Sequence, residues 1–181
     1  MGKKIVFLDR DGVINKLVER DGRHVSPRTF DDFEIFPEVP DAIGDLCDAG
    51  YEIVVVTNQP DISRGLMRLE ELELMHNLVN ALGVHEIRVC PHSDEDYCKC
   101  RKPQPGLLVD YLESVDEIVS ELWMVGDRET DVVCGNLVGA STILVSLANE
   151  SESLAKKIVT DLKEATRFIV SAEAWFDTGK E

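Results

Sequence analysis

The sequence predicts a Rossmann-like α/β domain, with a doubly wound parallel sheet that carries helices on both faces. Short, wholly apolar runs rich in Val and Ile alternate with longer amphipathic segments. Strands that are apolar on both sides are typical of parallel sheets covered by helices. Polar residues directly follow several of these runs, at the strand ends where such sheets bind ligands. The 181 residues fit one domain, 1–181.

The first half of the chain is expected to contain three strands. Residues 5–8 are four apolar residues that precede an acidic turn. A polar stretch, 16–36, is expected to be irregular, and a helix over 39–49 then ends at Gly50, because glycine suits the left-handed end of a helix. An apolar strand at 53–56 leads to a polar tripeptide. A helix over 69–82, ended by Gly83, precedes a strand at 87–90.

The second half continues the alternation of strand and helix. Residues 91–105 form a loop rich in Cys, Lys and Pro before a short helix over 106–114. A strand at 122–125, a helix over 130–138 and a strand at 142–145 follow. Apolar residues then recur at helical spacing, and they predict an amphipathic helix over about 151–172 that packs on the sheet. They are Leu154, Ile158, Leu162, Ala165 and Ile169.

The charge of the chain limits its partners. Nineteen basic and thirty-five acidic residues give a net charge of −16, which disfavours nucleic acid or an anionic membrane as a partner. No apolar stretch approaches the roughly 20 residues of a membrane span, and the first strand reaches Asp9 too soon for a signal peptide. Five cysteines, three of them clustered, fit a reducing cytoplasm better than a disulfide framework. We expect a cytoplasmic monomer.

Asp9 and Asp11 follow the first strand at a spacing that points both side chains the same way. Neighbouring carboxylates repel each other and are costly unless a cation or a reaction needs them. Taken alone, the stretch also fits a solvated turn, because Asp and Gly are common turn residues. Several polar residues follow predicted strand ends or lie close to them, so they are expected to converge at one edge of the sheet. This convergence favours an active site over a solvated turn. The polar residues are Asp9, Asp11, Thr57, Asn58, Lys102 and Asp127.

These residue types together describe phosphoryl transfer. One aspartate can attack phosphorus while its neighbour donates and accepts a proton. Clustered acids require a hard divalent cation, and Mg²⁺ is expected between Asp9 and Asp127. Thr57 offers a hydroxyl, Asn58 an amide and Lys102 a positive charge to anionic oxygens. Such groups stabilise the charge that develops on a transferring phosphoryl group.

From residue 5 to about residue 145, the chain resembles the haloacid dehalogenase (HAD) superfamily of phosphohydrolases. The resemblance implies that Asp9 forms an aspartyl-phosphate and that Asp11 protonates the leaving oxygen and then activates water. It also implies that Asp9, the main-chain carbonyl of Asp11 and Asp127 hold Mg²⁺, while Asp131 orients the site without binding the metal. The motifs that carry the resemblance, in the family's order, are Asp9 to Gly12, Thr57 to Gln59, Lys102 with Pro103, and Gly126-Asp127 with Asp131.

A second pattern predicts a zinc site in the loop 90–102. Three thiols and one imidazole lie within eleven residues, at Cys90, His92, Cys98 and Cys100. They match the ligands of a closed tetrahedral zinc site, whose role is structural because no coordination position is open. Free cysteines, or a redox pair formed by Cys98 and Cys100, are the alternative. The remaining cysteines, Cys47 and Cys134, are expected to be inert core residues.

The zinc loop narrows the resemblance to a small, capless branch of the superfamily. This branch contains D-glycero-D-manno-heptose 1,7-bisphosphate 7-phosphatases and histidinol-phosphate phosphatases, and residues 30–39 and 55–65 lean toward the heptose enzymes. The resemblance implies that Arg101, Arg128 and the turn from Asn58 and Gln59 to Asp61 contact substrate. Three features depart from the pattern. Pro60-Asp61 replaces the usual Ser-Gly, the segment after Asn15 reads Gly22-Arg-His-Val in place of the usual Gly-Tyr-Val, and the gap between His92 and Cys98 is closer to the histidinol-phosphate form.

The expected function is Mg²⁺-dependent hydrolysis of a small phosphorylated metabolite. A heptose bisphosphate is favoured, with histidinol phosphate or another sugar or polyol phosphate as the alternative. Arg64, Arg101, Lys102 and Arg128 are expected to form a basic pocket for a second anionic group. A phosphate-binding module without turnover is disfavoured, because it gains nothing from two adjacent aspartates. A phosphotransferase is also disfavoured, because it needs a cap to exclude water.

Overall fold

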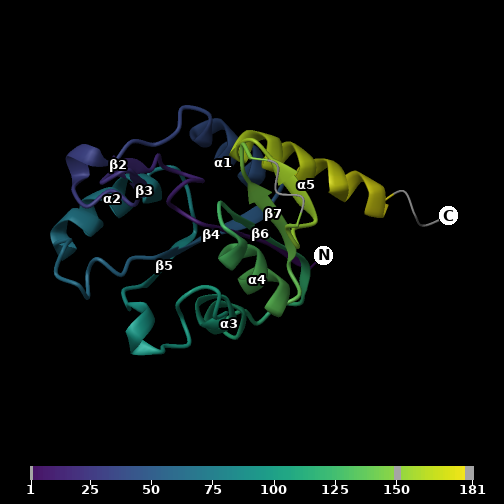
Figure 1. The fold of residues 1–181 in the computed structure, drawn as a ribbon. Coiled ribbons are helices and arrows are strands. Elements are labelled where there is room, and N and C mark those ends of the chain that lie inside the picture. Colours follow the sequence, from purple (N-terminus) through teal and green to yellow (C-terminus); the bar gives the residue numbers. More distant parts are fainter. Residues whose placement is uncertain (1, 149–151, 178–181) are drawn as a thin grey trace.

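Six strands form one parallel sheet in the order β5-β4-β1-β6-β7-β8. The computed structural model describes residues 2–148 and 152–177, and it confirms the predicted α/β fold class. Figure 1 shows the sheet between two layers of helices. The strands are β1 (Lys3–Leu8), β4 (Tyr51–Asn58), β5 (Glu86–Cys90), β6 (Val119–Gly126), β7 (Ser141–Val145) and β8 (Lys157–Val159).

Alternate residues of the central strand β1 face opposite helix layers. Val6 and Leu8 belong to a core shared with α1, α2 and α5, while Ile5 and Phe7 belong to a core shared with α3 and α4. All four side chains are fully buried, because helices cover both faces of the strand. The helices are α1 (Val39–Asp48), α2 (Leu69–Asn80), α3 (Gly106–Leu112), α4 (Glu129–Leu137) and α5 (Leu162–Asp177).

The register of the central strands places the predicted motifs at one edge. Leu8 lies opposite both Val55 of β4 and Val125 of β6. The residues after β1 therefore lie beside the carboxyl ends of two neighbouring strands. On the far side of β4, Asn58 lies opposite Cys90, the last residue of β5. The zinc loop consequently starts at the same edge of the sheet.

The segment 16–36 is more regular than predicted. It contains an antiparallel hairpin made of β2 (Val18–Arg20) and β3 (Arg23–Val25), followed by the single-turn 3₁₀ helix η1 (Phe30–Asp32). The two residues between the strands, Asp21 and Gly22, have φ angles of 51° and 70°. An Asp-Gly pair with left-handed backbone is a strong hairpin signal, so the sequence did carry this information.

The C-terminal helix begins later than predicted. Residues Lys157–Val159 form β8, a short edge strand, and α5 starts at Leu162. Residue 151, where the predicted helix was expected to begin, lies outside the described residues. The side chain of Leu154 is 68% exposed, whereas Leu162 is buried. The regular spacing from Leu154 onward therefore spans a loop, a strand and a helix, and only its last part is a helix face.

Cys47 also differs from the prediction, because it is exposed on α1, whereas Cys134 is buried as predicted. The buried positions of α1 are Val39, Ala42, Ile43 and Leu46. They form one stripe at helical spacing, and Cys47 lies beside this stripe on the solvent side. Within the described part of the chain, no helix is both long and apolar enough to span a membrane.

The corrected helix boundary predicts different costs for two leucine substitutions. Leu162→Ala should lower the free energy of unfolding by about 2–5 kcal/mol, because it leaves a cavity between α5 and the sheet. Leu154→Ala should change it by less than about 0.5 kcal/mol, since the side chain is exposed. Urea denaturation of both variants measures this difference. A helix that began near residue 151 would give the two variants similar losses.

Candidate active site and metal centres

Three carboxylates meet at the carboxyl edge of the sheet. Asp9, Asp127 and Asp131 each bring one oxygen into a group whose atoms all lie within 4.8 Å of one another. Two glycines make this approach possible. Gly12 has a φ of +86°, and a Cβ there would lie 2.4 Å from Oδ2 of Asp127. A Cβ on Gly126 would lie 2.1 Å from Cβ of Asp131, so both positions exclude any larger residue.

The ammonium group of Lys102 binds two of these acids. Its Nζ lies 2.8 Å from Oδ1 of Asp9 and 2.6 Å from Oδ1 of Asp131, and it donates a 2.8 Å hydrogen bond to the carbonyl of Val56. Burial alone would lower the pKa of Lys102, but the carboxylates of Asp131 and Asp9 outweigh it and hold the pKa above its usual value. Lys102 is therefore a fixed positive charge beside the proposed nucleophile.

One lysine does not satisfy three acids. Burial raises the pKa of Asp9 to about 8, and the nearby Asp131, Asp127 and Asp11 add to this effect while Lys102 opposes it. Burial and the neighbouring Asp131 raise the pKa of Asp127 to about 6. Oδ1 of Asp127 is buried and has no hydrogen-bond partner among the described residues. This oxygen and the clustered charge fit a hard divalent cation with oxygen ligands, such as Mg²⁺.

The carboxylate of Asp11 lies outside this group and binds other side chains. Oδ1 accepts hydrogen bonds from Arg10 Nη2 at 2.9 Å and Asn15 Nδ2 at 2.9 Å, and Oδ2 accepts one from Gln59 Nε2 at 2.6 Å. Burial raises the pKa of Asp11, but the Arg10 guanidinium and these hydrogen bonds outweigh burial and lower it. Both Asp9 and Asp11 line the cavity described below.

The end of β4 connects the two halves of the site. The fully buried Thr57 accepts a hydrogen bond on Oγ1 from Gln59 at 2.8 Å. Asn58 donates from Nδ2 to the Lys102 carbonyl and accepts on Oδ1 from the Lys102 main-chain N–H, both at 3.1 Å. The Asn58 amide therefore holds the backbone of Lys102, in addition to lining the cavity.

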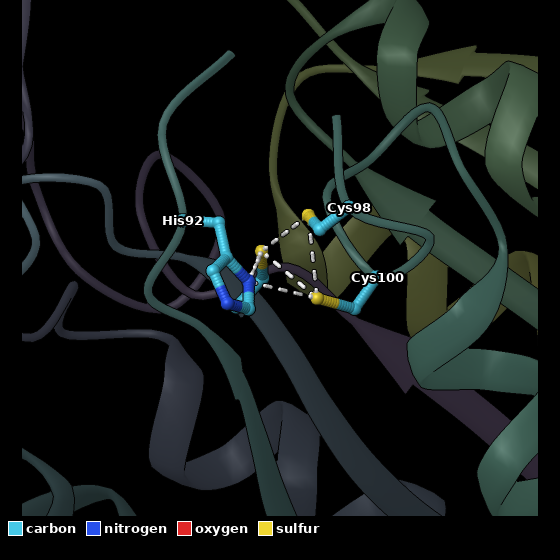
Figure 2. A group of neighbouring side chains, drawn as sticks. His92, Cys98 and Cys100 are labelled. Carbon is cyan, nitrogen blue, oxygen red and sulfur yellow. Dashed lines mark hydrogen bonds between the residues drawn. The ribbon is translucent and has the colours of Figure 1, made fainter. Parts of the chain in front are cut away.

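The four predicted zinc ligands point toward a common centre, and Figure 2 shows three of them labelled, His92, Cys98 and Cys100. Cys100 Sγ lies 3.2 Å from both Cys90 Sγ and His92 Nδ1, and Cys90 Sγ lies 3.7 Å from Cys98 Sγ. Sulfur ligands about 2.3 Å from a tetrahedral zinc are about 3.8 Å apart. The spacing and the donor set therefore fit a zinc ion.

The zinc loop also orients Arg101. Its Nε donates to Oδ1 of Asp94 at 2.6 Å and its Nη1 donates to the His92 carbonyl at 3.4 Å. Asp94 belongs to η2 (Asp94–Asp96), a single turn inside the loop. The ion pair with Arg101 lowers the pKa of Asp94. Arg101, which directly follows the last predicted ligand, is thus tied back to the start of the loop at His92 and Asp94.

A cavity of about 410 Å³ opens above the acid cluster. It contains the residues predicted to bind substrate, namely Asn58, Gln59, Arg64, Arg101, Lys102 and Arg128. It also contains residues that the sequence reasoning did not identify, in and after the β2–β3 hairpin, among them Arg23, His24 and Arg28. Their only sequence signal was the hairpin turn, because a polar segment does not reveal which way it folds.

Asp61, the acid that departs from the family pattern, is paired within the cavity. Its Oδ2 accepts a 2.6 Å hydrogen bond from Arg28 Nε, and its Oδ1 lies 3.5 Å from Arg64 Nη1. Arg28 comes from the segment after the hairpin and Arg64 from the turn before α2. The negative charge that Asp61 adds to the cavity is therefore balanced by two arginines.

Comparison with known proteins agrees with these features. The family described as "HAD-hyrolase-like" matches residues 99–170. The D-glycero-beta-D-manno-heptose-1,7-bisphosphate 7-phosphatase of Pseudomonas putida is 36% identical over 161 residues, covering 86% of this chain and 89% of that protein. The histidine biosynthesis bifunctional protein HisB of Legionella pneumophila is 32% identical over 170 residues, covering 91% of this chain and 47% of that protein.

Solved structures show the same relationship. The D,D-heptose 1,7-bisphosphate phosphatase from B. bronchiseptica, crystallised with magnesium and phosphate, matches with a TM-score of 0.80 and 28% sequence identity. The match covers 93% of this chain and 99% of that chain. Sequence relatives above 30% identity across most of both chains establish the family. The chain is a phosphoric monoester hydrolase of the HAD type and belongs to the family of the D-glycero-beta-D-manno-heptose-1,7-bisphosphate 7-phosphatases.

Proposed function

We propose that this enzyme removes the 7-phosphate of D-glycero-D-manno-heptose 1,7-bisphosphate in a Mg²⁺-dependent reaction. The proposal rests on one observation, namely that two groups of side chains with different chemistry line two halves of the same cavity. One half holds Asp9, Asp11 and Lys102, which suit phosphoryl transfer. The other half is lined by arginines, which suit a second phosphate on the same substrate. Relatives named for this activity support the choice of sugar.

The chemistry proceeds in two steps at the two aspartates of the first motif. Asp9 attacks phosphorus, held for this by the Arg10 main-chain N–H and by Lys102, each 2.8 Å from its Oδ1. Asp11 gives a proton to the sugar oxygen as its bond to phosphorus breaks. Water then attacks the aspartyl-phosphate and returns a proton to Asp11, which releases inorganic phosphate and restores Asp9.

Asp9 and Asp127, with the main-chain carbonyl of Asp11, would hold the Mg²⁺ ion, which supplies positive charge to the phosphoryl oxygens when bound. Asp131 positions Lys102 through their 2.6 Å contact. The hydroxyl of Thr57 accepts a hydrogen bond from Gln59, so its own proton is free to be donated to a phosphoryl oxygen.

The charge around the cavity favours a bisphosphate over histidinol phosphate. Asp61 and Asp94 are each paired with arginine, and Arg23 and Arg128 also line the cavity. The amine of histidinol phosphate would meet these like charges, whereas a second phosphate would be attracted. The similarity to HisB at 32% identity keeps histidinol phosphate as the second candidate substrate. A direct comparison of the two substrates decides between them.

The Cys90, His92, Cys98 and Cys100 site is proposed to bind one structural Zn²⁺ ion. Its four protein ligands leave no position for water or substrate. The loop between the ligands has few apolar residues, so the ion replaces a core that the loop lacks. Zinc thereby fixes the backbone that carries Arg101 and Lys102 into the active site.

The first prediction for the mechanism concerns the two aspartates. Asp9→Asn should abolish phosphate release in the presence of Mg²⁺, because an amide is not a nucleophile. Asp11→Asn should lower turnover by about 10²- to 10⁴-fold, the usual contribution of acid–base catalysis. Steady-state phosphate release measures both effects, with circular dichroism as the folding control. Near-native turnover by folded Asp9→Asn would refute the aspartyl-phosphate mechanism.

Zinc removal tests the structural site. Metal analysis should find close to one zinc per chain after dialysis against a weak chelator. Cys100→Ser should lose the zinc and most activity, because Arg101 and Lys102 lose their support. The matched control is Cys47→Ser, an exposed cysteine outside the cluster, which should keep both. A zinc-free Cys100→Ser enzyme with full activity would contradict the structural role.

Substitution of Arg101 tests whether this residue binds the second phosphate of the substrate. Arg101→Ala should reduce kcat/KM for heptose bisphosphate by about 10- to 150-fold, the value of roughly 1.5–3 kcal/mol for a lost charged hydrogen bond. The loss for a heptose monophosphate should be much smaller. The control Arg68→Ala removes the same charge from an exposed position outside the cavity lining. Equal losses on both substrates would show that Arg101 serves only the reacting phosphate.

A further inference from the structure

Arg10, between the two aspartates of the proposed mechanism, is a fully buried arginine whose side chain has no role in that mechanism. Its exposed fraction is 0%, and it is the largest of the fully buried side chains in the described part of the chain. A buried guanidinium is costly unless its donors are hydrogen-bonded and its charge is paired. Its partners therefore indicate what the residue is for.

The main partner of Arg10 is the carboxylate of Asp11. Nη2 lies 2.9 Å from Oδ1 and 3.1 Å from Oδ2, and Nε lies 3.3 Å from Oδ1. Asn15 and Gln59 each donate to one of the two oxygens, whereas Arg10 contacts both. The guanidinium thus limits the rotation of the carboxylate. Asp11 must direct its proton toward the leaving oxygen of the substrate, so the orientation of its carboxylate controls the rate of proton transfer.

The rest of the guanidinium is held by His76 and Phe33. Nη1 lies 3.2 Å from Nε2 of His76 on α2. Arginine can only donate, so Nε2 is the acceptor and the histidine carries its proton on Nδ1. Burial and the neighbouring Arg10 lower the pKa of His76 to about 4, which agrees with a neutral ring. The guanidinium also lies over the ring of Phe33, whose centroid is 5.4 Å from the guanidinium carbon.

We propose that His76, acting through Arg10, is a positioning residue for proton transfer by Asp11. The inference rests on the proposed aspartyl-phosphate mechanism and extends it to α2. Asp9 is held separately, by Lys102 and by the Arg10 main chain. Loosening the Arg10 side chain should therefore weaken acid catalysis while leaving nucleophilic attack intact. A residue that only stabilised the fold would affect both steps together.

Substrates with different leaving groups distinguish a positioning role of His76 from a purely structural role. A sugar alkoxide needs a proton as it leaves, whereas p-nitrophenolate leaves without one. His76→Leu should lower kcat/KM for a sugar phosphate by about 10-fold, a fraction of the about 10²- to 10⁴-fold that full acid–base catalysis contributes. It should leave kcat/KM for p-nitrophenyl phosphate nearly unchanged, because this constant reports the step that releases the leaving group and not the later attack of water, in which Asp11 serves both substrates. His76→Gln, whose amide oxygen can accept from Arg10, should recover most of the loss.

Three further variants complete the test. Met75→Leu changes the neighbouring buried residue of α2 at similar volume and should leave both rates near the native value. In an Asp11→Asn background, His76→Leu should cause no additional loss on the sugar phosphate. Phe33→Leu, which removes the ring that the guanidinium packs on, gives a second route to the same selective loss if His76→Leu folds poorly.

Each outcome decides the proposal. A loss confined to the sugar phosphate, rescued by Gln and absent with Asp11→Asn, supports it. Equal losses on both substrates, or additive losses with Asp11→Asn, overturn it in favour of a structural role. Failure of the aspartyl-phosphate mechanism is recognised separately, by turnover of the Asp9→Asn enzyme. The test compares two hydrolysed substrates and does not depend on which sugar phosphate is the natural one.

Discussion

The buried ion group formed by Lys102 with Asp9 and Asp131 is the constraint on which the rest of the site depends. A lysine with 4% exposure is stable there only because both acids and the Val56 carbonyl satisfy it. Lys102 reaches this position from a loop, not from the sheet. Asn58 pairs with its backbone and the Cys/His cluster pins the loop on the preceding side. The proposed zinc site and the buried charge of Lys102 are therefore structurally linked through this loop.

Local and overall charge act in opposite directions in this molecule. A net charge of −16 repels anionic metabolites at long range, although salt screens that repulsion beyond about 10 Å. Inside the cavity, arginines from the hairpin segment, the turn before α2 and the zinc loop face the same space. An anion gains from these charges only after it has entered. This arrangement discriminates between substrates by contact, and it gains little from long-range attraction.

The part of the site that holds Asp9, Thr57 and Asp127 was predictable, because the apolar strand patterns show where each strand ends. Asp9, Thr57 and Asp127 stand at or beside the ends of apolar strands, and parallel pairing brings such ends together. Gly12 and Gly126 were readable as turn residues, but their close approach to Asp127 and Asp131 is a property of the folded chain. The zinc cluster was also predictable, since its ligands are near neighbours in sequence.

The missed features depend on contacts between distant segments. Arg10 stands between two recognised aspartates, yet its partner His76 is 66 residues away, and neither residue has a local pattern that indicates the pairing. Arg28 and Asp61 are likewise joined only in the fold. β8 is an edge strand of three residues, too short for alternation to distinguish it from a helix turn. Cys47 was misplaced because it lies next to the buried stripe of α1.

The division between strand ends and loops has a consequence for specificity. The acids proposed to carry the chemistry lie shortly after β1 and β6, where a shift of backbone would close the space that Gly12 and Gly126 leave open. The arginines proposed to contact the rest of the substrate lie on the hairpin segment, the turn at residues 60–65 and the zinc loop. Their charges are balanced by Asp61 and Asp94, which also belong to loops. Replacement of one such acid–arginine pair would change the charge that the cavity presents to the substrate, while the ion group around Lys102 would stay intact. The Pro60-Asp61 departure fits this scheme, because its added acid is matched by Arg28 and Arg64 within the same cavity.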